Sequence, residues 1–398
     1  MSAPKSSKTR TGGKASVRPV KSSPAAQSDR FVVIMAGGRG ERFWPVSREK
    51  TPKQLIQLLG DRSFLQEAVD RVRPLVPVEN ILVITNAAQA GEVRKQLPEL
   101  PPANVVAEPV GRDTCAAVTL AAAVVGARCP SATMAVLPAD HVIPEPGKFQ
   151  QVLSDALDLA SRGQVIVTIG IKPTGPETGY GYIRHAVVEL PPPAGGKRLR
   201  TALHKVEQFV EKPVLERAIE YVAAGNYRWN AGMFVWSFIT ITNALEQHCP
   251  EMHAACQRWF AAASKSPAAL SRVLAREYPE IRKISVDYAV MEKAHNIVVA
   301  DGDFAWDDLG AWPALSRHVK KDPEGNAVVG EVIHVDAARN VVYDARKARR
   351  TPITLVGVKD SIIVLTDDAV MVAAKSEAQK IKDLVRKLAA DKAYARLV

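Results

Sequence analysis

A glycine-rich segment near the start of the chain has the composition of a phosphate-binding loop. Residues 37–42 read Gly-Gly-Arg-Gly-Glu-Arg and directly follow a short apolar run, residues 31–35, that is typical of a buried β-strand. Glycine lets backbone N–H groups approach an anion without a side-chain clash, so such a loop can surround phosphate oxygens. A tight turn from a strand into a helix has the same composition, and the glycines by themselves do not separate the two interpretations.

Two basic residues favour phosphate binding. Arg42 ends the glycine-rich segment, and Lys53 follows within the sequence Thr-Pro-Lys-Gln at residues 51–54. A guanidinium fork and an ammonium charge are suited to holding a triphosphate while charge moves onto a leaving group. The dinucleotide-binding fingerprint lacks its third glycine because Phe43 stands there, and the sequence contains no P-loop consensus. These two absences disfavour a nicotinamide-dependent oxidoreductase.

The elements that must position this segment alternate between strands and helices. Four further apolar runs resemble the first, and helical patterns separate several of them. The runs are residues 81–85, 104–107, 133–137 and 165–170, and the helical patterns are residues 64–72, 87–97, 114–127 and 149–161. Uniformly apolar strands separated by helices predict a mainly parallel sheet that is covered on both faces. We therefore expect a Rossmann-like α/β domain, with a mixed, mainly parallel sheet, whose ligands bind outside the carboxyl ends of its strands.

The pattern changes twice after residue 170. Strand-like segments at residues 179–185, 205–210 and 227–236 are expected to build the second half of a substrate cleft. From about residue 325, short Val/Ile runs follow at close intervals and a helix ends the chain, which predicts a small C-terminal β domain. A left-handed β-helix is one arrangement for it, although no strict repeat can be counted. The expected parts are a disordered basic tail (1–29), the α/β domain (30–318) and the C-terminal β domain with its helix (325–398).

The net charge of +11 is concentrated at the N-terminus. Residues 1–30 carry seven Lys or Arg residues against one Asp, so they contribute +6 and leave +5 for the rest of the chain. A mildly basic folded part suits an enzyme that handles polyphosphates, whereas a nucleic-acid partner would require a basic face with stacking aromatics. No run reaches the roughly 18 apolar residues of a membrane span. The four cysteines are scattered without a metal-binding CxxC pair, which suits a reducing cytoplasm.

The glycine-rich segment is the first of several blocks that together resemble the sugar-nucleotide pyrophosphorylases. Within them, the chain is most similar to the mannose-1-phosphate guanylyltransferase branch. The matching blocks are residues 34–48 with 52–54, 108–114, 137–141, 171–174, 177–183, 209–213, 229–234, 287–293 and 306–312. The resemblance covers residues 31–375 and implies that the α/β domain is a nucleotidyltransferase domain.

The resemblance implies transfer of the guanylyl group of GTP to α-D-mannose 1-phosphate, giving GDP-mannose and pyrophosphate, with Mg²⁺ as cofactor and a homodimer as the assembly. The sugar phosphate is already an anionic nucleophile, so no general base is required. The site must instead align that oxygen with the α-phosphorus and neutralise the leaving pyrophosphate. Two alternatives remain: the same chemistry with another hexose 1-phosphate or nucleoside triphosphate, and a catalytically silent relative that binds nucleotide as a regulatory subunit. The presence of Arg42 and Lys53 favours an active enzyme.

Two aspartates are expected to hold the metal. Asp140 follows the predicted strand at residues 133–137, and the resemblance pairs it with Asp308 in the pattern Trp-Asp-Asp-Leu-Gly. Carboxylates, phosphate oxygens and water together match the octahedral oxygen ligands of Mg²⁺, although an Asp at a strand end is otherwise often a helix N-cap. The register against the family pattern selects Asp308 over Asp307. His141 is expected to be structural, because imidazole suits Zn²⁺ better than Mg²⁺.

Glu108 is the candidate for recognising the base. Guanine presents its N1–H and N2–H₂ donors side by side, and a carboxylate can accept both, whereas adenine and uracil offer no such pair. Asp113 stands where the family more often has Asn, and it could equally cap the helix that follows. The resemblance assigns nucleotide contacts to Ala36, Gly37, Gly38, Gly40, Glu108, Gly111 and Asp113, and catalytic roles to Arg42, Lys53 and Lys212.

The sugar is assigned to three further positions. The resemblance places Gly181, Glu211 and Asn230 against the hexose hydroxyls, with Lys212 beside the sugar phosphate. Carboxylate and amide groups suit this task because paired hydroxyls both donate and accept hydrogen bonds. At strand ends, such side chains are otherwise ordinary solvated groups.

Overall fold

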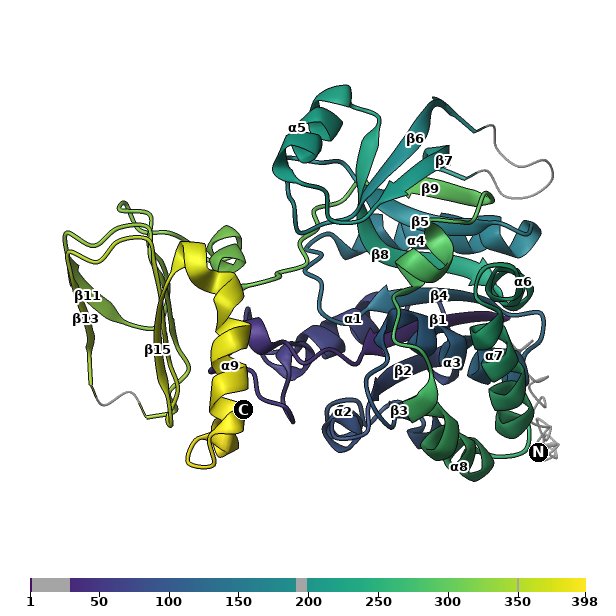
Figure 1. The fold of residues 1–398 in the computed structure, drawn as a ribbon, viewed down its shortest axis with the longest axis horizontal. Helices are drawn as coiled ribbons and strands as arrows, with labels where there is room; N and C mark the ends of the chain where they lie inside the picture. Colours follow the sequence, from purple (N-terminus) through teal and green to yellow (C-terminus); the bar gives the residue numbers. More distant parts are fainter. Residues whose placement is uncertain (2–28, 191–198, 349–350) are drawn as a thin grey trace.

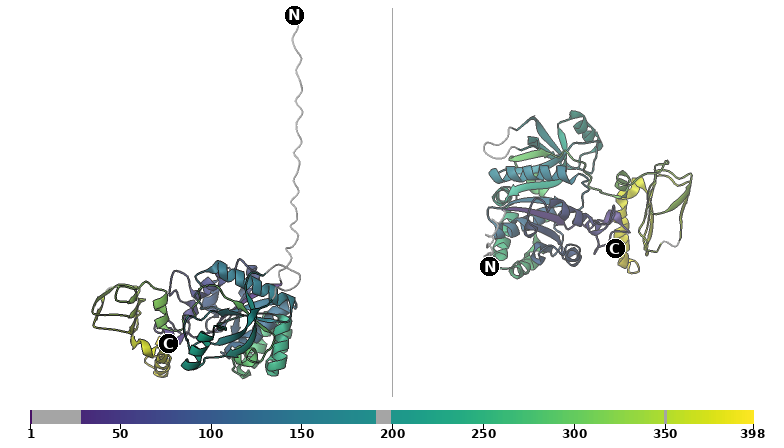
Figure 2. Two further views of the ribbon diagram at one scale, coloured as in Figure 1. Left: turned by 90° about the horizontal axis from the view of Figure 1, so that it is seen from above. Right: turned by 180° about the vertical axis from the view of Figure 1, so that it is seen from behind.

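The computed structural model describes Met1 and residues 29–190, 199–348 and 351–398. The tail predicted over residues 1–29 lies almost entirely outside these residues. The described chain forms two domains, an α/β domain around one large sheet and a smaller β domain beside it (Figures 1 and 2).

The large sheet has nine strands and confirms the predicted α/β architecture. Its strands are β1 (Arg30–Ala36), β2 (Ile81–Asn86), β3 (Val105–Glu108), β4 (Thr133–Pro138), β5 (Ile166–Ile171), β6 (Tyr182–Glu189), β7 (Leu203–Val210), β8 (Tyr227–Ser237) and β9 (Ile297–Asp301). Their order is β3-β2-β1-β4-β8-β5-β9-β7-β6. β7 and β8 run against the other strands, and β8 is inserted between β4 and β5. The sheet is therefore mixed and mainly parallel.

Helices cover both faces of the sheet, which is why its inner strands are apolar at successive positions. On one face pack α1 (Phe64–Val72), α2 (Ala90–Gln96) and α4 (Pro146–Arg162). On the other face pack α3 (Asp113–Arg128), α6 (Phe238–His248), α7 (Pro250–Ala263) and α8 (Pro267–Glu277). The short helix α5 (Leu215–Ala224) lies near β6 and β7 (Figure 1). No helix of the described residues has both the length and the apolar surface needed to cross a membrane.

Two helices, α1 and α3, illustrate how the sequence specifies these elements. Ser63 and Gln66 form a capping box at α1: the Ser63 hydroxyl accepts the Gln66 N–H, and the Gln66 side chain accepts the Ser63 N–H. α3 is buried on nearly all sides because it lies between the sheet and α6 and α7. Its run of alanines allows this close packing.

The C-terminal domain is built from short strands in two small sheets. Its elements are β10 (Ala327–Val329), β11 (Val332–Val335), β12 (Val341–Asp344), β13 (Ile353–Val356), β14 (Ser361–Leu365), β15 (Val370–Ala374) and α9 (Ile381–Ala390). β10, β12 and β14 are parallel neighbours in one sheet, which antiparallel β15 completes, and β11 pairs with β13 in the other. The strands from β10 to β14 thus alternate between two sheets, as in a β-helix. The predicted C-terminal β domain is confirmed.

The two domains share a continuous apolar junction. Trp44, shortly after the glycine-rich segment, is buried in one cluster with Trp312 and with Ile381 of α9. The Trp44 indole N–H donates to the Leu397 carbonyl over 2.8 Å, and the Trp312 indole N–H donates to the Trp44 carbonyl over 3.0 Å. α9 lies between the small sheets and the α/β domain in both figures. The junction therefore fixes the C-terminal helix against the segment that follows β1.

Candidate active site

The glycine-rich segment begins directly after β1 and faces two neighbouring cavities. Gly37 and Gly38 line the first, a cavity of about 350 Å³ that also includes Glu108 and is here called the Glu108 cavity. Gly40 lines the second, a cavity of about 390 Å³ that includes Lys53 and is here called the Lys53 cavity. Both lie beyond the carboxyl end of β1, where an α/β sheet is expected to bind its ligands.

The backbone at Gly40 requires a residue without a side chain. Its φ of +62° lies in the left-handed region, and a Cβ there would stand 2.6 Å from both the Cβ and the backbone N of Lys53. The side-chain amide of Gln54, the residue after Lys53, donates to the carbonyls of Gly38 and Ala36. Ala36 is itself buried in the core and is not among the residues lining either cavity, so the structure does not bring this predicted nucleotide contact to them.

Lys53 lies at the junction of the predicted catalytic groups. It begins a 3₁₀ turn, η2 (Lys53–Leu55), and is 4% exposed. Its Nζ donates to Asp140 Oδ2 over 2.9 Å and to the Asp308 carbonyl over 2.5 Å. Burial would raise the pKa of Asp140, but the charge and hydrogen bond of Lys53 hold that pKa below its ordinary value. Arg42 lines the same cavity and donates to the Gly310 carbonyl over 3.3 Å.

A pair of backbone hydrogen bonds brings the two predicted metal ligands together. The Val142 N–H donates to the Asp307 carbonyl over 2.9 Å, and the Asp307 N–H donates back over 3.1 Å. The segment after β4 is thereby aligned with the segment after β9, and Asp140 and Asp308 line one cavity. The Tyr180 hydroxyl donates to Asp308 Oδ1 over 2.9 Å, while burial raises the pKa of Asp308 above its ordinary value.

Asp307 and His141, the neighbours of these two aspartates, have different partners. Asp307 accepts hydrogen bonds from Arg317 at 2.6 and 2.8 Å and lies 2.7 Å from His318 Nε2. Burial opposes its ionisation, but His318 and Arg317 hold its pKa well below the usual range. His141 accepts the Trp306 indole N–H at Nδ1 over 3.1 Å, and burial lowers its pKa to about 4, so the imidazole is neutral at physiological pH.

Glu108 ends β3 and lies in the wall of its cavity beside the glycine-rich segment. It is 6% exposed, its Oε1 accepts the Tyr278 hydroxyl, and a Cβ added to Gly37 would stand 2.8 Å from its Oε2. Burial raises the pKa of Glu108 to about 7, against the opposing effect of the Tyr278 hydrogen bond. This carboxylate therefore changes charge near neutral pH.

Asp113 lies where both interpretations of it place the residue, on a cavity wall and at the start of a helix. It lines the Glu108 cavity together with Gly111 and the start of α3. Its φ is +67°, and its Oδ1 accepts the N–H of Thr114 over 2.8 Å. The carboxylate thus satisfies one of the free N–H groups at the beginning of α3 while the residue forms part of the cavity wall.

The three predicted sugar residues come together from the strands of the second half of the sheet. Gly181 precedes β6, Glu211 follows β7 and Asn230 lies on β8. A Cβ at Gly181 would stand 2.5 Å from Glu211 Oε2 and 3.3 Å from Asn230 Cβ, and the Asn230 N–H donates to the Gly181 carbonyl over 2.8 Å. Lys212 donates to Glu211 Oε1 over 2.5 Å. Of the three predicted catalytic cations, Lys212 thus lies with the sugar residues, away from the lining of the Lys53 cavity.

Asp287 is a site residue to which the sequence reasoning gave no role. It begins a π-helical turn, η6 (Asp287–Met291), lines the Glu108 cavity and accepts the Asn230 side-chain N–H over 2.9 Å. Burial and the nearby Glu211 carboxylate raise its pKa to about 6. Its block, residues 287–293, was part of the family resemblance, but nothing in the local sequence indicates that it connects the predicted sugar residues to the Glu108 cavity. Tyr278 was missed for the same reason.

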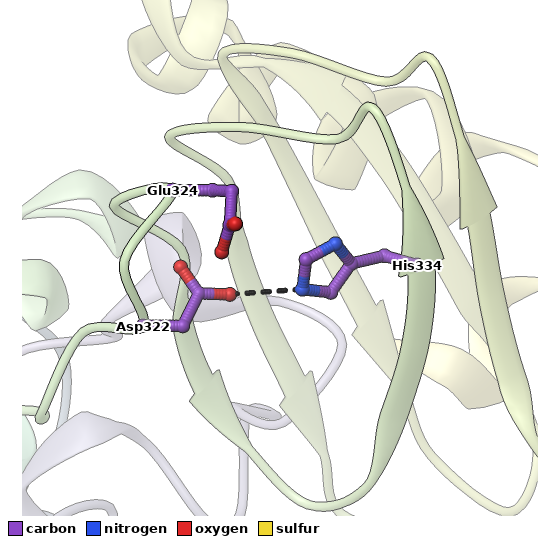
Figure 3. Close-up of side chains that lie close together, drawn as sticks. All are labelled: Asp322, Glu324 and His334. Carbon is purple, nitrogen blue, oxygen red and sulfur yellow. Dashed lines mark ion pairs between the residues drawn. The ribbon is translucent and has the colours of Figure 1, made fainter.

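A second group of potential metal ligands lies in the C-terminal domain, where Asp322, Glu324 and His334 point toward one another (Figure 3). Their ligand atoms all lie within 4.8 Å of one another. Both Asp322 oxygens are already engaged, by the backbone and side chain of Asn326 at 2.7 and 2.9 Å and by His334 at 3.0 Å. These contacts join the turn before β10 to β11, so we assign the cluster to the first coil of the β domain and not to the cavities.

Family models match both domains. One described as nucleotidyl transferase matches residues 31–325, and one described as a MannoseP isomerase/GMP-like β-helix domain matches residues 330–388.

Individual proteins of known name also resemble the chain along most of its length. It is 38% identical to a mannose-1-phosphate guanylyltransferase of Escherichia coli K12, over 92% of this chain and 75% of that protein. It is 37% identical to a mannose-1-phosphate guanylyltransferase of Sinorhizobium fredii, over 92% of this chain and 69% of that protein. A crystal structure from Thermus thermophilus, titled as a mannose-1-phosphate geranyltransferase, superposes with a TM-score of 0.77 at 36% identity, covering 91% of this chain and 99% of that one.

Proposed function

This chain belongs to the mannose-1-phosphate guanylyltransferase family of nucleotidyl transferases, and we propose that it transfers the guanylyl group of GTP to α-D-mannose 1-phosphate. The products are GDP-mannose and pyrophosphate. The observation that carries the proposal is the pairing of two adjacent cavities along one glycine-rich segment. One contains a buried carboxylate suited to guanine, and the other contains Lys53 between Asp140 and Asp308.

The guanine assignment rests on Glu108. In its ionised form this carboxylate has two oxygens that can accept the neighbouring N1–H and N2–H₂ donors of guanine. A buried position strengthens such charge-assisted hydrogen bonds because water does not compete for them. Tyr278 occupies only Oε1 in the free protein, and it fixes the orientation of the carboxylate.

The metal assignment rests on the oxygen donors of Asp140 and Asp308. Two carboxylates on the wall of one cavity, next to a lysine, are a donor set that fits Mg²⁺ and does not favour Zn²⁺. A bound Mg²⁺ would neutralise phosphate charge and favour departure of pyrophosphate. The hydrogen bonds from Lys53 and Tyr180 orient the two aspartates toward the cavity.

The chain's own residues supply alignment and charge. The mannose 1-phosphate oxygen attacks the α-phosphorus of GTP as the bond from that phosphorus to the bridging oxygen of pyrophosphate breaks, and no proton has to be removed. Arg42 and Lys53 stabilise the charge that passes to the leaving group. Glu211 and Asn230 orient the sugar, and Lys212 binds its phosphate, so the nucleophile approaches from the side opposite the leaving group.

The assay that tests the proposal measures pyrophosphate release with mannose 1-phosphate and each of GTP, ATP, UTP and CTP. We expect GTP to be used with a kcat/KM at least about a hundredfold above the others, because a site built to accept two N–H donors rejects bases that lack them. Equal use of UTP or ATP would remove the guanine role of Glu108. Replacing mannose 1-phosphate with glucose 1-phosphate in the same assay tests the sugar. Binding of GTP without turnover would instead support a silent regulatory relative.

We further propose a homodimer that acts in the cytoplasm. All four cysteines are free thiols, as expected in a reducing compartment. Sedimentation of the purified chain at several concentrations tests the assembly, and a monomer at micromolar concentration would exclude the dimer.

A further inference from the structure

The last helix of the chain contributes a lysine to the Lys53 cavity. α9 packs against the turn that ends the glycine-rich segment, because its buried residues Ile381 and Val385 join Phe43 and Trp44 in the junction cluster. Lys382 follows Ile381 and, although it belongs to the C-terminal domain, it lines the same cavity as Lys53. The α/β domain alone therefore does not complete this cavity.

Unlike the nearby cations Lys380 and Arg386, Lys382 has no protein partner among the described residues. Lys380 pairs with Glu377 at 2.5 Å, and Arg386 pairs with Asp383 at 3.0 Å. Within the described residues, Lys382 forms no hydrogen bond and no ion pair, although it is half-buried. A half-buried ammonium facing a cavity keeps its charge available for an anionic ligand.

Lys53 is already held by protein groups, because it donates to Asp140 and to the Asp308 carbonyl. Three other cations line the cavity with unused capacity. Arg39 lies 3.7 Å from Glu41, Arg42 makes a long contact with a backbone carbonyl, and Lys382 has no partner among the described residues. Of these three, Arg39 and Arg42 are exposed and Lys382 is half-buried.

The order of the cavities along the glycine-rich segment indicates which phosphates Lys382 meets. Gly37 and Gly38 line the Glu108 cavity, and Gly40 lines the Lys53 cavity, so a nucleotide whose base contacts Glu108 extends its phosphates toward α9. The predicted sugar residues connect to the Glu108 cavity through Asp287. The phosphates farthest from base and sugar, which leave as pyrophosphate, therefore lie nearest to α9.

We propose that Lys382 binds the β- and γ-phosphates of the nucleoside triphosphate and the pyrophosphate that they become. The proposal rests on the proposed nucleotidyl transfer. When the bond between the α-phosphorus and the bridging oxygen breaks, its electron pair remains on pyrophosphate. Lys382 keeps its proton throughout and offsets that negative charge.

The experiment compares Lys382→Ala with Lys382→Arg and with Lys387→Ala, a matched control because Lys387 is exposed on the same helix. Kinetics are measured in both directions for all four substrates. In Lys382→Ala we expect the KM values of GTP and pyrophosphate to rise about tenfold to a hundredfold, the range for one lost charge-assisted hydrogen bond. The KM values of GDP-mannose and mannose 1-phosphate, which lack the β- and γ-phosphates of GTP, should stay within about twofold. Lys382→Arg should recover most of the loss, and Lys387→Ala should match the wild type.

Two results would overturn the role of Lys382. One is unchanged KM values for GTP and pyrophosphate in Lys382→Ala. The other is a rise of all four KM values together with a lower melting temperature, because that pattern reports a structural role.

Calorimetric binding of inorganic pyrophosphate with Mg²⁺ separates this proposal from the proposed function. If the wild type fails to transfer guanylyl groups but binds pyrophosphate more tightly than Lys382→Ala does, the function is wrong and the role of Lys382 stands. If substitution leaves pyrophosphate binding unchanged, the role of Lys382 is wrong whatever the activity.

Discussion

Asp307 and Asp308 are adjacent and carry the same side chain, yet their surroundings give them different roles. Asp307 is bound by Arg317 and His318 next to the hydrogen bonds that join Val142 to its own backbone. Asp308 faces the Lys53 cavity with one side-chain hydrogen bond, from Tyr180. One aspartate therefore holds the backbone in position, and the other faces the cavity.

Exchanging each aspartate for asparagine should separate these roles. Asp308→Asn should lose about a hundredfold to a thousandfold in kcat and keep its unfolding free energy, because it removes charge from the cavity alone. Asp307→Asn should lower the unfolding free energy by about 2 kcal/mol, less than for a fully buried ion pair because Arg317 is half exposed. Urea unfolding at neutral pH, where Asp307 is ionised, and steady-state assays measure both. A stable Asp307→Asn with low turnover would reverse the assignment.

Glu108 should make GTP binding depend on pH. Its raised pKa, about 7, means that it loses charge as the pH falls below neutrality, and only the charged form accepts both guanine donors. The KM for GTP should therefore rise toward tenfold per pH unit below about 7. Measuring KM from about pH 8 to about pH 6 in wild type and Glu108→Gln isolates this effect, since titration of the GTP phosphates is common to both. Glu108→Gln should have a higher KM for GTP than the wild type at about pH 8, and it should lack the additional rise of KM at lower pH. A constant ratio between the two proteins across this range would contradict the prediction.

At the scale of elements, the strand β1, the glycine-rich segment and η2 act as one unit. The turn at Gly40 fits against the backbone of Lys53, and Gln54 bonds to the carbonyls of the segment. The sequence Pro-Lys-Gln is therefore both the support of the glycine-rich segment and the source of its lysine. Any displacement of η2 moves the lysine and the loop together.

Gly40→Ala should disturb this unit, because a left-handed φ costs an L-residue about 1–2 kcal/mol and the new Cβ would collide with Lys53. We expect a lower melting temperature and a lower kcat. Gly38→Ala is the control for stability, since a Cβ there meets nothing within 4 Å. Thermal unfolding and steady-state assays of both variants provide the test. Equal melting temperatures for the two would show that the turn at Gly40 carries no strain.

At the scale of the whole molecule, the C-terminal domain is part of the candidate active site and not a separate appendage. At the junction, Trp44 donates to the Leu397 carbonyl and accepts a hydrogen bond from Trp312, and α9 brings Lys382 to the cavity. The β domain therefore positions the segment that follows the glycine-rich segment.

Trp312→Ala should therefore affect stability and pyrophosphate binding together. Trp312 is fully buried, so its truncation should cost about 3–5 kcal/mol of unfolding free energy and raise the KM for pyrophosphate in the enzyme that remains folded. Trp236→Ala is the matched control, because Trp236 is equally buried but packs at the start of β4, opposite Met134. It should lose similar stability with an unchanged KM for pyrophosphate. Urea unfolding and the reverse reaction measure the two quantities. If both variants had the same KM for pyrophosphate, the junction would have no part in positioning the cavity.

Much of the architecture follows from the order of the amino acids alone. Short apolar runs and helical periods predicted β1 to β5 and their helices, because strands buried on both faces are mostly apolar. The C-terminal β domain followed from its short Val/Ile runs. The family followed from the ordered blocks, and the comparisons confirmed it. The roles given to single residues remain predictions.

Which residues meet depends on the tertiary structure. The insertion of β8 between β4 and β5, the hydrogen bonds between Val142 and Asp307, and the connection of Asp287 to Asn230 all join segments far apart in the chain. Local periodicity contains no information about such contacts, because they depend on strand order and on the packing of distant elements. The same holds for Lys382, whose helix reads from its sequence as an ordinary amphipathic terminus. Only the packing of α9 against the junction shows that this lysine faces the cavity.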